Sequence, residues 1–249
     1  LTDVAIVETA DVKVGAIARS FYGTMTNCSA AGTLEMNNTE FNSTTTNKFD
    51  IINIGGLVGQ AGNATFENCE NRVNVTIKSV TVPTLTTYIA VGGAIGGIHT
   101  LSSLTNVDNY GAITIDVRHE KAVYIHAAGV VGQMISYSTD EANAPDVKVA
   151  TQCDNHGTIQ TTAETTGLGA STYAGIVATM ARGITNFSDN HNHGAITCND
   201  HVAGRTIGGI VGTHSWSAIT NCTNNAALTN NGNAAATHTG GIIGRDVLF

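Results

Sequence analysis

Gly55-Gly56-Leu57-Val58-Gly59 is a glycine-rich apolar stretch, and Asn68-Cys69-Glu70-Asn71 follows it after a short interval. This cassette recurs about six times along the chain, and such self-similarity decides the architecture before any local pattern does. If the second Gly of the stretch, or its equivalent, is taken as the start, the repeats start near residues 15, 56, 93, 129, 175, 209 and 241.

A small apolar residue, called the landmark here, follows the start Gly after 12 to 14 residues in five repeats and after 24 in the fourth, which carries an insertion. The landmarks are Cys28, Cys69, Val107, Cys153, Phe187 and Cys222. An apolar column lies six residues further on, at Leu34, Val75, Ile113, Ile159 and Leu228, and at Ile196 after a local insertion near residues 188–191. Apolar residues with a spacing of two, on segments too short for helices, predict β-strands. Fixed offsets joined by connections of variable length predict stacked coils.

Asparagine and glycine mark the corner after each landmark. Asn71, Asn109 and Asn155 lie two residues after it, and Gly111 and Gly157 follow two residues later. Both residue types tolerate the left-handed backbone region, so Asn-x-Gly predicts a tight corner. A second column precedes the landmark, at Asn27, Asn68, Asn106, Asn186 and Asn221. Such asparagines either hydrogen-bond along the column or each satisfy their own turn, and the sequence leaves this open.

The paired motifs resemble the GLUG-type repeats of bacterial surface proteins. The resemblance covers roughly residues 14–245, although the repeats here are longer than the compact form and the first lacks the Gly-Gly pair. It implies a β-helical or β-roll stalk of the kind found in adhesin-like proteins and beside some secreted peptidases. It brings no catalytic residues. We therefore expect one all-β repeat solenoid over residues 1–249, a parallel β-helix of about six coils, with a β-roll as the alternative.

Composition narrows the range of partners. The net charge is −8, and no cluster of Lys or Arg appears, which argues against nucleic acid and anionic membrane surfaces. No apolar run is long enough for a membrane helix. Charged residues make up 12% of the chain, about half the usual fraction, as in secreted β-rich stalks. The five cysteines fit buried hydrophobic columns, so we expect free thiols and no zinc.

Two outward columns are candidate sites. Glu70, Asp108 and Asp154 each follow a landmark and form an acidic stripe, which is either a solvated face or a weak calcium site. The position between Asn and Gly carries Arg72, Tyr110, His156, His193 and Asn225. This column is either plain surface, a ledge on which sugars stack, or, at its histidines, a shared metal site.

Two further aromatic residues lie in loops. Tyr137 belongs to an insertion over residues 133–150, and Trp216, the sole tryptophan, lies in the matching loop of the last full repeat. Surface loops carry function more often than scaffolds do, and an exposed Trp suits ligand stacking. Tyr110, His156, His193, Tyr137 and Trp216 are therefore the candidate binding residues.

These observations predict a non-catalytic extracellular or cell-surface protein, an adhesin-like stalk or binding module for glycans or surface proteins. No cofactor is expected, with calcium at the acidic stripe as the alternative. A spacer that binds nothing is a further alternative. So is a polysaccharide lyase or hydrolase, which requires acidic or basic residues that converge in one groove.

Overall fold

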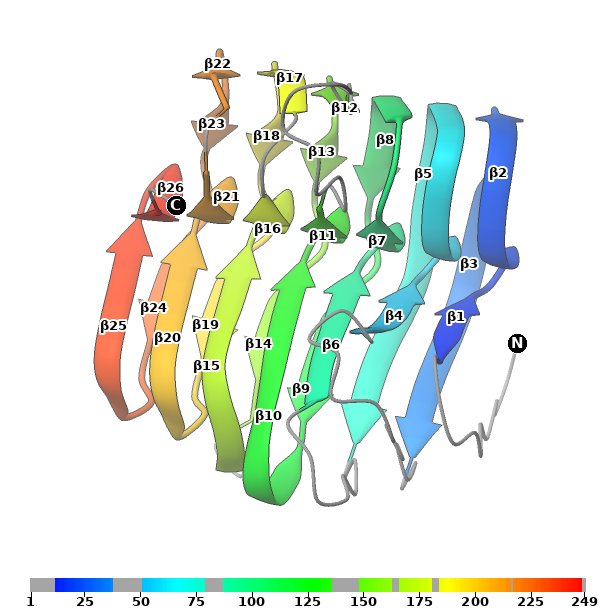
Figure 1. The fold of residues 1–249 in the computed structure, drawn as a ribbon. Helices are drawn as coiled ribbons and strands as arrows, with labels where there is room; N and C mark the ends of the chain where they lie inside the picture. The colour runs from blue at the N-terminus through cyan, green and yellow to red at the C-terminus, as the bar shows by residue number, and fades with distance from the viewer. Residues whose placement is uncertain are drawn as a thin grey trace.

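The computed structural model describes residues 12–37, 51–78, 87–135, 148–162, 166–180, 184–215 and 217–247. Each coil begins with a strand of a seven-stranded sheet, here called sheet A, which faces the viewer in Figure 1. Its strands are β1 (Lys13–Gly15), β4 (Ile51–Gly55), β6 (Thr87–Gly92), β10 (Arg118–Ala128), β15 (Thr166–Ala174), β20 (Val202–Gly208) and β25 (Ala234–Gly240).

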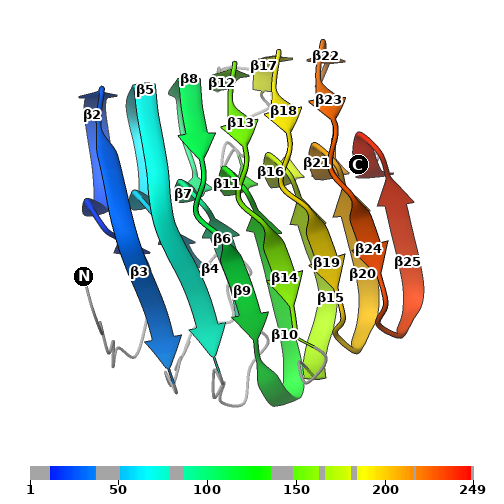
Figure 2. The same cartoon turned by 180° about the vertical axis from the view of Figure 1, so that it is seen from behind.

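The rest of each coil belongs to a second, nineteen-stranded sheet. After the glycine turn the chain enters β2 (Ala18–Thr26), β5 (Val58–Lys78), β7 (Ile95–Ile98), β11 (Val131–Met134), β16 (Val177–Met180), β21 (Val211–His214) or β26 (Ile243–Asp246). It continues through β8 (Ser102–Asn109), β12 (Lys148–Thr151), β13 (Asp154–Asn155), β17 (Ile184–Ser188), β18 (His191–Asn192), β22 (Ile219–Thr220) and β23 (Thr223–Asn224). It returns along the back, as Figure 2 shows, through β3 (Ser29–Asn37), β9 (Ile113–Asp116), β14 (Ile159–Thr161), β19 (Ile196–Cys198) and β24 (Leu228–Asn230), with the end of β5 in the second coil.

Every strand pairing among the described residues is parallel and joins neighbouring coils, and the register shifts only within the β2–β5, β10–β15 and β12–β17 pairs. The described strands belong to six coils and the start of a seventh, which follow one another from blue to red in Figure 1. The molecule is therefore an all-β solenoid of the parallel β-helix type, as the repeat predicts. The described residues contain no helix with the length and apolar character that a membrane crossing requires.

A waist of glycine and asparagine divides the interior into two apolar cores. Ile89 and Ile113 belong to the core between sheet A and the back strands. Phe66 and Leu104 belong to the core on the other side of the waist. At the waist, the second glycine of the turn lies against the asparagine of the same coil: a Cβ on Gly56 would lie 2.2 Å from Asn71 Oδ1. The glycine-rich stretch and the Asn-containing motif of each repeat thus contact each other across the coil.

The waist asparagines form a buried ladder. Asn71 Nδ2 donates to Asn109 Oδ1 at 2.8 Å, and Asn109 Nδ2 donates in the same way to Asn155 Oδ1. The ladder continues through Asn192 to Asn224. Each of these amides also bonds its own turn, as Asn109 Nδ2 does with the Gly111 carbonyl at 2.9 Å. Hydrogen bonds along a column and within a turn are therefore combined in the same side chains.

The predicted backbone roles at the corner are wrong in detail. The left-handed residues lie before the landmark, as with Asn68 (φ 54°) and Asn106 (φ 54°), where they turn the chain. Asn106 Nδ2 also donates to Asn68 Oδ1 at 2.8 Å. Gly111 is instead required by close packing, because a Cβ there would lie 2.0 Å from the Val73 carbonyl oxygen of the preceding coil.

The register also corrects two repeat assignments. Phe187 pairs with Ala150, three residues before the landmark Cys153, and Asn190 takes the landmark position, since His191 pairs with Asp154. The buried Asn190 amide bonds the backbone of the preceding coil in place of apolar packing. The additional residues of this repeat therefore lie before Phe187, and Asn186 is not in the column of Asn68.

In the first coil, Gly15 pairs with Gly55 rather than with Gly56. Ala16 consequently stands at the waist position, and the ladder position of this coil is also alanine, since Ala30 pairs with Asn71. The first repeat therefore starts one residue later than the pattern predicts.

The interior becomes polar toward the C-terminal coils. Arg205 and Asp200 form a fully buried ion pair, with 2.7 Å between Arg205 Nη2 and Asp200 Oδ1. Tyr173 donates its hydroxyl proton to Asp200 Oδ2 at 3.1 Å, and Thr161 donates to Oδ1 at 2.9 Å. Paired positions of sheet A show the change along the solenoid: Ile52, Ile89 and Ile125 pair with one another in the earlier coils, whereas Ser171, Arg205 and Thr237 pair with one another in the later coils.

Candidate functional site

Residues on the outer side of the Asn corner stack into a continuous row, here called the ring file: Arg72, Tyr110, His156 and His193. The Arg72 guanidinium lies 4.5 Å from the centre of the Tyr110 ring. Tyr110 and His156 stack at 4.6 Å between ring centres and 4° between planes, and His156 and His193 at 4.9 Å and 10°. The in-register coils impose this spacing, because neighbouring strands lie about 4.8 Å apart.

The ring file covers its own ring faces. Both faces of Tyr110 are occupied, one by Arg72 and the other by His156. His156 is likewise enclosed between Tyr110 and His193. Tyr110 is nevertheless 39% exposed, and both histidines are exposed. The part of these rings that faces solvent is therefore the edge, and the face-on sugar ledge considered from the sequence has no free face at the two central rings.

The predicted acidic stripe, here called the carboxylate file, runs beside the ring file. Glu70 pairs in register with Asp108, and Asp108 Oδ1 accepts a hydrogen bond from the Asp154 backbone N–H at 3.1 Å. In the fifth coil His191 occupies this column, whereas one residue after the expected landmark Phe187 would be Ser188. His191 was missed because Phe187 resembles a landmark, and only the spacing to Ile196 pointed to the correct register.

Local bonds engage the carboxylates. Glu70 forms an ion pair with Arg72, which raises the pKa of the Arg72 guanidinium. Partial burial raises the pKa of Asp108. Burial also raises the pKa of Tyr110, assisted by the negative charges of Asp108 and Glu70. Among the described residues no three His, Cys, Asp or Glu side chains converge to hold a metal ion, and calcium binding stays a prediction.

Two of the predicted binding residues, Tyr137 and Trp216, lie outside the described residues. A second aromatic stack that sequence reasoning missed lies on sheet A, where Tyr88 and Tyr124 stack at 4.8 Å. Tyr88 and Tyr124 pair in register between β6 and β10. Their equal spacing from the glycine turn of each repeat was the sequence signal that could have revealed the stack.

The five cysteines are free thiols, as predicted.

Comparison with known proteins gives one match. The family model described as the GLUG motif matches residues 51–76. No curated protein and no solved structure matches the chain. The matched segment runs from the start of β4 through the glycine turn into β5. It therefore includes both sides of the waist contact, Gly56 and Asn71. Residues 51–76 are therefore similar to the GLUG motif, and they lie in the second coil of the solenoid.

Proposed function

We propose that the protein is a non-catalytic extracellular module of a bacterial surface protein that binds glycans through the ring file. The GLUG motif occurs in extracellular and surface β-helix-like proteins, which supports the location. The observation that carries the binding function is the exposed stack of Arg72, Tyr110, His156 and His193. Aromatic side chains with polar tips are typical of recognition surfaces.

The ring file is ordered before a ligand arrives. Each ring is held by its neighbours at stacking distance, and such pairs contribute about 0.5–1.5 kcal/mol beyond area burial. Side chains that are already fixed lose little conformational entropy on binding. Glu70 and Asp108 accept local hydrogen bonds, and the carboxylates lie along one column. This arrangement supports binding rather than hydrolysis, since a hydrolase needs two carboxylates on either side of one bond.

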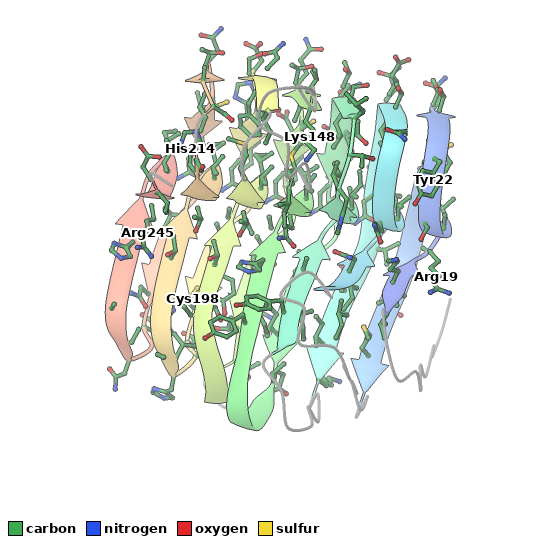
Figure 3. The ribbon with its side chains drawn as sticks, viewed as in Figure 1. Arg19, Tyr22, Lys148, Cys198, His214 and Arg245 are labelled. Carbon is green, nitrogen blue, oxygen red and sulfur yellow. The ribbon has the colours of Figure 1, made fainter. Side chains whose placement is uncertain are left out.

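A glycan array tests the proposal. The purified chain is applied with and without calcium, beside a variant that carries Tyr110→Ala and His156→Ala. Tyr22→Ala is the matched control, because Tyr22 is 67% exposed and lies on β2 of the first coil (Figure 3), whereas the ring file begins at Arg72 of the second coil. We expect the wild type and the control to bind the same glycans and the double variant to lose them. If the wild type bound no glycan with or without calcium, the result would favour a passive spacer. Unchanged binding by the double variant would place recognition elsewhere.

A further inference from the structure

We propose that the ring file and the carboxylate file together bind a neutral polyhydroxylated glycan through hydrogen bonds to ring edges. This inference rests on the proposed function and names its ligand class. It starts from the enclosed faces of Tyr110 and His156. A sugar cannot stack on a ring face that a neighbouring side chain already covers, so the Tyr110 hydroxyl and the His156 nitrogens are the groups that these two rings can offer.

The two files present complementary hydrogen-bonding groups. Tyr110 and the imidazole N–H groups of His156 and His193 donate, whereas Asp108 and Asp154 accept. In each coil the two positions lie on either side of an inward Asn, as Asp108 and Tyr110 flank Asn109, and both therefore point outward. A sugar hydroxyl both donates and accepts. A polyhydroxylated chain along the solenoid axis would meet a donor and an acceptor in the third coil, at Tyr110 and Asp108, and again in the fourth, at His156 and Asp154, about 4.8 Å further on. In the fifth coil His191 replaces the carboxylate.

Charge selects among glycans. Glu70, Asp108 and Asp154 line one side of the site, and the chain carries a net charge of −8. The only Arg in the ring file, Arg72, is already paired with Glu70. A uronate or sulfated chain would bring like charges against this file, which lowers affinity and slows association. Neutral hexose polymers meet no such repulsion.

The hydroxyl of Tyr110 separates edge recognition from face recognition. Tyr110→Phe keeps the ring and its stack with His156 but removes the hydroxyl, and Tyr22→Phe is the control. Loss of one neutral hydrogen bond is expected to weaken binding by about three- to tenfold. Glycan affinity is measured by titration calorimetry with the strongest array ligand. A ligand that contacts the ring only through its carbon surface would bind Tyr110→Phe and wild type equally, and this result would overturn the edge-on inference.

Matched pairs on the array test the charge preference. Each neutral hexose oligomer is printed beside the uronate oligomer of the same linkage, and the array is read at low and high salt. We expect neutral members to bind at least about fivefold better at low salt, with a smaller difference at high salt because salt screens exposed charges. Preferred binding of uronates would refute the ligand class and leave glycan binding intact. Absence of any bound glycan would instead refute the proposed function.

Discussion

Replacement of Asn155 by alanine measures what the buried ladder contributes. The Asn155 side chain is fully buried. Its Nδ2 donates to the Gly157 carbonyl at 2.9 Å and to Asn192 Oδ1 at 2.8 Å, and its Oδ1 accepts from Asn109 Nδ2 at 2.8 Å. Three lost hydrogen bonds at about 1 kcal/mol each would lower the free energy of unfolding by about 3 kcal/mol. This is a large part of the roughly 5–15 kcal/mol that is typical of whole domains.

The assay is urea unfolding followed by far-ultraviolet circular dichroism, with the slope of the transition compared among variants, because repeat proteins can lose cooperativity. Asn225→Ala is the control, since Asn225 is exposed and should change stability by less than about 0.5 kcal/mol. Asn224→Ala should fall between the two, because Asn224 is half-buried and receives the last ladder bond. If Asn155→Ala were no more destabilising than Asn225→Ala, the ladder would contribute nothing and the reasoning would fail.

Three further outcomes follow from packing and charge. Gly129→Ala should lower the melting temperature far more than Gly204→Ala, because a Cβ would lie 2.1 Å from the waist Asn at the first position but 3.5 Å from its nearest neighbour at the second; equal effects would show that the waist adjusts freely. Arg205→Met should lower the free energy of unfolding in urea by about 3–5 kcal/mol, because it leaves Asp200 buried without its ion-pair partner. Adding Asp200→Asn should recover part of this loss, and a larger loss in the double variant would contradict the account. Burial raises the pKa of Asp108 above its ordinary 3.8, so the stability that this group contributes at low pH is lost as the pH rises through its folded pKa. Asp108→Asn should therefore be more stable than the wild type at pH 7 but not below pH 3.8. Thermal unfolding of both proteins at several pH values measures this, and an equal difference in melting temperature at pH 7 and below pH 3.8 would contradict the reasoning.

The repeat was sufficient to predict the fold because each column is a physical contact between neighbouring coils. Cys69 and Val107, aligned by spacing alone, pair in register, and so do Val75 and Ile113. The prediction failed where a buried polar residue took an apolar position. Asn190 occupies a landmark position because its amide bonds the backbone of the coil before it, and spacing rules that expect an apolar residue select Phe187 instead.

The columns of the candidate site were also readable from the sequence, but the orientation of its rings was not. The shared offset of Tyr110, His156 and His193 predicts one outward row. Whether the rings lie flat against the surface or stack on one another depends on side-chain torsions, which no sequence pattern specifies. Stacking at 4.6 Å and 4.9 Å is what converts the hypothesis of a face-on ledge into one of recognition through edges.

The contact at the waist also limits how one repeat can diverge from another. Coils two to six pair a waist Gly with a ladder Asn, as Gly56 does with Asn71. The first coil has neither residue and carries Ala16 and Ala30 in their places. A mutation that changes one partner alone either drives a methyl group into an amide or leaves the ladder without a member. The two positions are therefore expected to change together, and new coils should be gained or lost by duplication or deletion of whole units.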